Sequence, residues 1–68
     1  MQTLFLEADM IRLGQALKLA NLVESGGAAK VVLTDGLVQV NGAVETRRGR
    51  QLHAGDVISL GEQQVQLM

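Results

Sequence analysis

The stretch SGGAAKVVLTDGLVQVNG, residues 25–42, decides the fold class, because its hydrophobic period changes from one typical of a helix to one typical of a strand. Ser25 is a favoured helix N-cap residue, since its short side-chain oxygen accepts from the free amides of a first turn. Apolar residues then recur at spacings of three and four until Gly36, which can take the left-handed conformation that ends many helices. Beyond it, apolar and polar residues alternate. The stretch predicts a helix over 26–34 and a strand that begins at Val38.

Towards the C-terminus, the sequence predicts two β-hairpins. Asn41-Gly42 is a strong signal for a two-residue turn, because both positions of a type I′ turn need a positive φ. We expect the chain to return through residues 44–46 and later to form a strand over 57–60. Gly61-Glu62 then predicts a turn into a last strand over 63–67, where valine and leucine alternate with glutamine.

Towards the N-terminus, the sequence predicts a short strand over 2–6 and a helix over 10–20. Asp9 is the expected N-cap of this helix, and Asn21 ends its pattern. Apolar residues recur in it at spacings of three, four and three, which draws one apolar stripe. Gly14 lies inside the helix, where glycine costs about 1 kcal/mol relative to alanine. We therefore expect Gly14 to mark close packing against another element.

In chain order, the predicted elements are one strand, two helices and four strands, all within 68 residues. This order predicts an α+β fold in which a two-helix hairpin packs on a small, mostly antiparallel β-sheet. A chain of this length supports one domain, which we expect to span residues 1–68.

The residue inventory excludes several classes of function. The chain has no cysteine, a single histidine, His53, and a single aromatic residue, Phe5. A zinc finger, a thiol enzyme and a Ser-His-Asp hydrolase need residues that this chain lacks in useful number. A sheet that stacks RNA bases needs several aromatic residues. Because His53 has no carboxylate or nucleophile beside it in the sequence, we expect a protein that is not an enzyme and that needs no metal or cofactor.

The chain also lacks the signals of a membrane or secreted protein. No apolar run approaches the roughly eighteen residues of a membrane span. The first ten residues have neither the basic start nor the long apolar stretch of a secretion signal. We therefore expect a soluble cytoplasmic protein with no membrane partner.

The formal net charge of −1 conceals a segregation of charge along the chain. Residues 11–50 hold all six basic residues against three acidic ones, for a net +3, whereas residues 1–10 and 51–68 hold two acidic residues each. Arg47-Arg48-Gly49-Arg50 is the most informative stretch. Three guanidiniums within four residues can meet at phosphate, which the planar fork binds in a bidentate manner. The alternative is a solvated loop whose charge keeps the protein soluble.

Several short motifs follow one another in a specific order. They are Arg12-Leu13, Ser25, Ala29-Lys30, Asp35-Gly36, Val38-Gln39-Val40-Asn41-Gly42 and Gly55-Asp56. Together they resemble the RNA-binding domain of small-subunit ribosomal protein S four. The segment Gly42–Arg47 looks like the hairpin of the small stand-alone bacterial members of this family, the YbcJ-like proteins. The resemblance covers about residues 12–60.

The resemblance implies an alpha-L RNA-binding motif, in which two helices beside a β-hairpin form an L-shaped surface. In this family, basic side chains of both helices and of the loop after the hairpin meet RNA phosphates. By position, the RNA-binding residues that the resemblance implies are Arg12, Lys18, Lys30, Arg47, Arg48 and Arg50. The family often has an arginine directly after the serine of the second helix, where this chain has Gly26.

Two hypotheses about function remain open. The first is a non-enzymatic protein that contacts structured RNA mainly through phosphates, in the setting of RNA metabolism or ribosome assembly that the family suggests. Ribosomal or RNA-processing proteins are then expected partners, and we expect a monomer. The alternative is a protein–protein interaction module that keeps the fold without significant RNA affinity, which the net charge of −1 favours. A ubiquitin-like sulfur carrier is rejected, because the chain ends in Leu67-Met68 rather than Gly-Gly.

Overall fold

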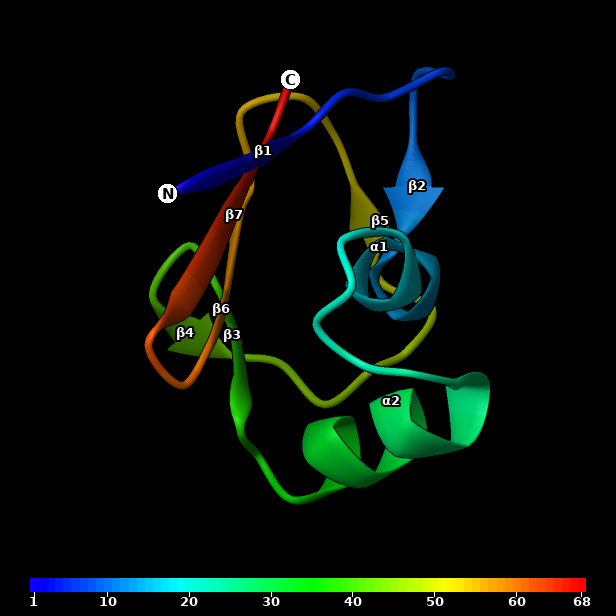
Figure 1. Ribbon diagram of the computed structural model, residues 1–68, viewed down its shortest axis with the longest axis vertical. Coiled ribbons are helices and arrows are strands. Elements are labelled where there is room, and N and C mark those ends of the chain that lie inside the picture. The colour runs from blue at the N-terminus through cyan, green and yellow to red at the C-terminus, as the bar shows by residue number, and fades with distance from the viewer.

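The computed structural model describes residues 1–68 and places a five-stranded β-sheet beside two short helices (Figure 1). The elements in chain order are β1 (Gln2–Leu4), β2 (Ile11–Arg12), α1 (Leu13–Leu19), α2 (Gly26–Thr34), β3 (Val38–Val40), β4 (Ala43–Val44), β5 (Gln51–Leu52), β6 (Val57–Leu60) and β7 (Gln63–Leu67). In Figure 1 the sheet lies on the left and the helices lie on the right. The predicted α+β class, with a two-helix hairpin on a small sheet, is confirmed.

The strands of the main sheet are ordered β1-β7-β6-β3-β4, and only the β1–β7 pair is parallel. This pair brings the two ends of the chain together. The amide of Met68 donates to the carbonyl of Leu4 at 3.0 Å, and the amide of Leu6 donates to the carbonyl of Met68 at 2.9 Å. The prediction of a mostly antiparallel sheet is confirmed, although the first predicted strand ends at Leu4 rather than at Leu6.

The local signals for α2 and for the first hairpin are confirmed. Ser25 accepts a hydrogen bond at 3.1 Å from the amide of Ala28, and the helix ends before Gly36, whose φ is 73°. The Asn41-Gly42 turn between β3 and β4 has φ values of 53° and 85°. These positive values lie in the left-handed region that asparagine and glycine tolerate better than other residues.

The predicted start of the first helix at Met10, with Asp9 as its N-cap, is wrong. The chain reaches the helix as an extended strand, β2, and α1 begins at Leu13. β2 pairs in antiparallel with β5, so that Ile11 lies opposite Leu52. This small second sheet was not predicted, because its two strands are far apart in the sequence and each is only two residues long.

The first turn of α1 is bound by the loop between β4 and β5 instead of by a side-chain cap. The amide of Leu13 donates to the carbonyl of Arg50 at 2.9 Å, and the amide of Gly14 donates to the carbonyl of Arg48 at 3.0 Å. A helix N-terminus leaves four amides without partners inside the helix. Backbone carbonyls from a distant loop therefore satisfy two first-turn amides of α1, and the helix does not use the local cap that the sequence predicted at Asp9.

The hydrophobic core lies between the main sheet and the helices. Its buried members are Leu13, Ala16, Leu17, Ala20, Ala29, Leu33, Val38, Val40, Leu52, Ile58, Val65 and Leu67. The set includes Leu13 and Leu17 of α1 and Ala29 and Leu33 of α2, so the predicted inward faces of both helices are confirmed. Neither helix has the length and apolar character that crossing a membrane requires.

Candidate nucleic-acid interface

Arg48 crosses α1 at Gly14, where the helix has no side chain. A Cβ atom built on Gly14 would overlap with Cγ of Arg48 and would lie 3.1 Å from its Cδ. The backbone hydrogen bond between the same two residues holds the loop at this distance. The prediction that Gly14 marks close packing against another element is confirmed, and the element is the arginine-rich loop.

Arg12 is bound to the same loop, beside a hollow that is lined by residues of both helices. Its Nη1 donates to the carbonyl of Gly49 at 2.8 Å. The hollow lies between α1, the start of α2 and the loop, and it is lined by Arg12, Gly14, Gln15, Lys18, Gly26, Ala29, Arg48 and Gly49. Three of these side chains are cationic and none is acidic.

Two further hollows adjoin the first. One is lined by Lys30, Leu33, Thr34, Thr46 and Arg48, and the other by Arg47, Gly49, Arg50 and Gln51. The first hollow shares Arg48 with one and Gly49 with the other, so the three form one continuous area, which we call the basic surface. Its cationic members are Arg12, Lys18, Lys30, Arg47, Arg48 and Arg50, and no aspartate or glutamate lines it. The structure thus brings together all six residues that the sequence singled out.

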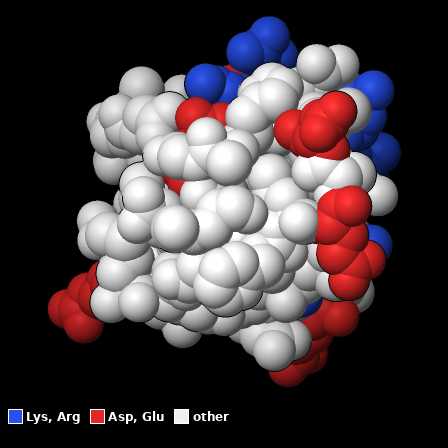
Figure 2. Space-filling view, turned by 90° about the horizontal axis from the view of Figure 1, so that it is seen from above, with Lys and Arg blue, Asp and Glu red and all other residues white.

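The basic side chains are distributed unevenly over the molecule, and the three hollows of the basic surface have no acidic lining residue. Figure 2 views the molecule from the side on which the C-terminus lies in Figure 1. On this face the lysine and arginine side chains are visible only along the edges, where acidic side chains lie beside them. The net charge of the whole chain is therefore a poor measure of the charge that a ligand meets on the basic surface.

Glu45 is a component of this region that the sequence analysis missed. Its side chain is only 9% exposed and accepts hydrogen bonds from the amides of Thr46 and Arg47 at 3.0 and 3.1 Å. It also accepts from Nε and Nη2 of Arg47 at 3.1 and 3.0 Å, and from Nη1 of Arg50 at 3.1 Å. One carboxylate thereby closes the turn that carries the three arginines.

These hydrogen bonds lower the pKa of Glu45 from 4.5 to about 2. The side chain of Arg47 is the largest cause, followed by the backbone amide of Arg47, and the guanidinium of Arg50 adds to them against the opposing effect of burial. Glu45 is therefore ionised at neutral pH. Its only signal in the sequence is an acidic residue two positions before an arginine run.

The three arginines of this loop consequently have different surroundings. Arg47 and Arg50 share the carboxylate of Glu45 and line one hollow. Arg48 forms no ion pair and lines the other two hollows. The sequence predicted that three guanidiniums meet at one place. In the structure, Arg48 lines the two hollows next to the helices, whereas Arg47 and Arg50 line the third hollow.

His53 lines none of these hollows, and its backbone takes part in a turn network instead. Its amide donates to Oδ2 of Asp56 at 2.8 Å, and Nδ2 of Asn41 donates to Oδ1 of Asp56 at 3.0 Å. The bond from Asn41, followed by that from His53, lowers the pKa of Asp56. Asn41 therefore connects its own turn to the turn at residues 53–56. No group of three histidine, aspartate or glutamate side chains is placed to hold a metal ion.

The family of the chain follows from its fold, its basic surface and its sequence together. The S4 domain matches residues 4–68, which is nearly the whole chain. The chain belongs to the S4 domain family. The resemblance drawn from the short motifs is thereby confirmed, and it extends beyond residues 12–60 on both sides.

Individual relatives are small proteins of similar length. RlbA of Bacillus subtilis, named a probable ribosome maturation protein, is 47% identical over 55 residues, which cover 81% of this chain and 78% of RlbA. YbcJ of Escherichia coli is 40% identical over 58 residues, which cover 85% of this chain and 83% of YbcJ. The solution structure of YbcJ, described as having an alpha-L motif involved in RNA-binding, matches with a TM-score of 0.76 at 38% identity, over 100% of this chain and 87% of that chain. The alpha-L architecture is confirmed.

Proposed function

We propose that this chain is a non-enzymatic RNA-binding protein that contacts structured RNA mainly through its phosphates. The observation that carries the proposal is the basic surface, where six cationic side chains line three adjoining hollows without an acidic side chain. The alpha-L motif described for YbcJ and the ribosome maturation named for RlbA support it.

Phosphate contacts supply most of the affinity in this mechanism. Each phosphate that a lysine or arginine neutralises releases condensed counterions, so the logarithm of the affinity falls linearly with the logarithm of the salt concentration. With four to six contacts, we expect a slope on the order of −3 to −5. The four basic residues without a carboxylate partner carry most of this slope, whereas Arg47 and Arg50 are partly neutralised by Glu45.

Arg48 is the central residue of the proposed site. It lines one hollow together with Lys18 of α1 and another together with Lys30 of α2. Its backbone is fixed by the hydrogen bond from Gly14. A guanidinium in this place can bind one phosphate in a bidentate manner while the two lysines contact neighbouring phosphates as point charges.

Recognition of RNA then rests on shape and 2′-hydroxyl groups rather than on base stacking. Phe5 is the only aromatic residue of the chain, and it lines a hollow outside the basic surface. Paired RNA presents 2′-hydroxyls and phosphates across a wide, shallow minor groove, where shape and backbone contacts suffice. We therefore infer that the ligand is a structured RNA rather than an unpaired strand.

The setting that we propose is ribosome maturation, and hence the cytoplasm, because RlbA is named for this process. The chain acts as a monomer on RNA in this proposal, and ribosomal or RNA-processing proteins are further partners.

The experiment is a titration of the full chain with a stem–loop RNA and with the DNA stem–loop of the same sequence, each at several salt concentrations. Arg48→Gln is expected to weaken RNA binding and to make the salt slope less negative by about 1. Gln64→Glu is the matched control, because it also lowers the net charge by one but alters an exposed residue of β7, outside the basic surface. Equal effects of both variants would show that only net charge matters, which contradicts a defined site.

The structure adds one observation in favour of the protein-interaction alternative, since α2 presents Lys30 as its only basic residue. It predicts no RNA binding even at low salt, with an unchanged fold. The same titration therefore separates the two functions.

A further inference from the structure

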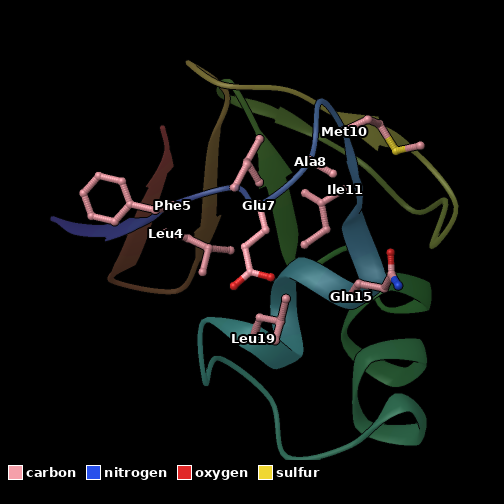
Figure 3. A pocket seen from close by; sticks show the side chains of 9 residues that line it. Leu4, Phe5, Glu7, Ala8, Met10, Ile11, Gln15 and Leu19 are labelled. Atoms are coloured by element: carbon pink, nitrogen blue, oxygen red, sulfur yellow. The ribbon is translucent and has the colours of Figure 1, made fainter.

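A hollow outside the basic surface lies between residues 4–11 and α1 (Figure 3). Its large apolar members are Leu4, Phe5, Leu6, Met10, Ile11 and Leu19. Glu7 and Gln15 are the polar side chains among them. One wall is the segment 4–11, which connects the main sheet to the small β2–β5 sheet, and the other wall is α1.

Two apolar residues that line this hollow are largely exposed to solvent. Phe5 is 73% exposed and Leu19 is 64% exposed. Figure 3 shows that Phe5 lies beside β1 with its ring directed away from the other labelled side chains, while Leu19 lies on the wall formed by α1. Contiguous exposed apolar side chains with a polar rim mark interaction sites on the surfaces of soluble proteins.

The one charged side chain that lines this hollow is acidic, in contrast to those of the basic surface. The carboxylate of Glu7 points into the hollow among the apolar side chains (Figure 3) and has no hydrogen-bond or ion-pair partner in the chain. Asp9 follows in the same segment and is also unpaired. Residues 4–11 contain no lysine or arginine. Arg12 follows them directly, and the other five basic residues lie further along the chain.

We propose that this hollow docks a short amphipathic segment of a basic partner protein, with an apolar side chain in the hollow and a lysine or arginine on Glu7. The apolar walls provide the burial, and the unpaired carboxylate of Glu7 selects a positively charged partner. RNA is a poor occupant, because its phosphates would face the carboxylate of Glu7.

The position of the hollow relates it to the basic surface. Gln15 lines both, so the first turn of α1 is all that separates them. A basic protein segment docked on the hollow therefore lies next to RNA held on the basic surface, where the phosphates attract it as well. The chain then joins one RNA to one basic protein through neighbouring faces.

The probe is a synthetic helical peptide with leucines on one face and lysines on the other, titrated into the isotope-labelled full chain and followed by the amide signals. We expect shifts in residues 4–11 and at Leu19 that shrink as salt rises. A peptide with glutamates in place of the lysines, and one with serines in place of the leucines, are expected to leave these signals unchanged, because each lacks one half of the required chemistry.

Two substitutions connect the shifts to the hollow. Glu7→Gln is expected to weaken peptide binding about two- to fivefold, the range for an exposed ion pair. Leu19→Gln is expected to weaken it on the order of tenfold through lost apolar burial. Glu62→Gln is the matched control, because it removes a carboxylate from the β6–β7 turn and is expected to change nothing. All three residues are exposed, so the melting temperature should stay constant.

Several outcomes overturn the proposal. The glutamate peptide binding as tightly as the lysine peptide removes the selection by charge. Shifts from the RNA stem–loop in residues 4–11 make the hollow part of the RNA site. Self-association that Leu19→Gln abolishes shows that a second copy of the chain is the occupant. Both hollow variants should retain RNA affinity, so failure here is distinguishable from failure of the proposed function.

Discussion

The carbonyl of Arg48 accepts a hydrogen bond at 3.0 Å from the amide of Gly14, and the side chain of Arg48 lies where a side chain on Gly14 would be. A single glycine in α1 therefore decides where the central arginine of the basic surface is held. Because the contact joins a helix start to a loop more than thirty residues later, it ties the geometry of the proposed RNA site to the folding of the small β2–β5 sheet.

Gly14→Ala is expected to reduce RNA affinity without unfolding the protein. The added Cβ displaces the side chain of Arg48, while the helix gains about 1 kcal/mol of propensity that offsets part of the strain. Gly27→Ala is the control, since the nearest atom to its Cβ is Oγ of Ser25 at 3.8 Å. It should raise the melting temperature and leave the affinity unchanged. Equal affinities of both variants would contradict the role of Gly14.

The stability of the protein is expected to fall as the pH falls from about 4.5 to about 2, in part because of Glu45. Its carboxyl group has a pKa of about 2 in the folded chain and near 4.5 when unfolded, so the unfolded state takes up the proton first. The stability that Glu45 contributes is complete above the unfolded pKa and is lost through this window. Urea unfolding at a series of pH values measures it, and Glu45→Gln should flatten the dependence. If the free energy of unfolding of this variant still falls with pH as in the parent chain, the loss of stability is due to Asp56, whose pKa is also lowered, and not to Glu45.

Glu45→Gln is also expected to make the salt slope of RNA binding more negative by about 1. Arg47 and Arg50 lose their shared carboxylate, so a further guanidinium becomes available to neutralise phosphate. Glu62→Gln raises the net charge by the same amount outside the basic surface and should leave the slope as it is. A less negative slope for Glu45→Gln would mean instead that the carboxylate is needed to hold the two arginines in place.

Leu33→Ala is expected to destabilise the protein by about 2–5 kcal/mol, because it leaves a cavity in the core. A single core in a chain of this size rarely supplies more than about 3–5 kcal/mol, so much of this variant should be unfolded at room temperature. Val31→Ala, on the same helix, removes a side chain that is 57% exposed and should change the stability by less than about 0.5 kcal/mol. Thermal unfolding of both variants tests the assignment of the inward face of α2.

Much of the fold could be predicted because its signals are local. Ser25 caps a helix that begins at the next residue, and Gly36 ends it by adopting a positive φ. Asn41-Gly42 forms the turn of its own hairpin. In each case the interacting atoms are a few residues apart, so residue type and spacing were sufficient.

The six basic residues were also singled out from the sequence, because the resemblance to the RNA-binding domain of ribosomal protein S four implied them. Their grouping into one surface depends on the fold. The β2–β5 pairing and the hydrogen bond from the amide of Gly14 to the carbonyl of Arg48 bring Arg12 and Arg48 together. Both interactions join segments that are far apart in the chain.

The sequence by itself therefore determined the fold class, the limits of α2, the hairpin turn and the identity of the basic residues. Only the tertiary structure decided where α1 begins and which arginines form ion pairs with Glu45. The carbonyls of Arg48 and Arg50 replace the cap expected from Asp9, and the carboxylate of Glu45 binds two guanidiniums. Hydrogen bonds between distant segments form only once the chain has folded, and for this reason no local pattern of residues announces them.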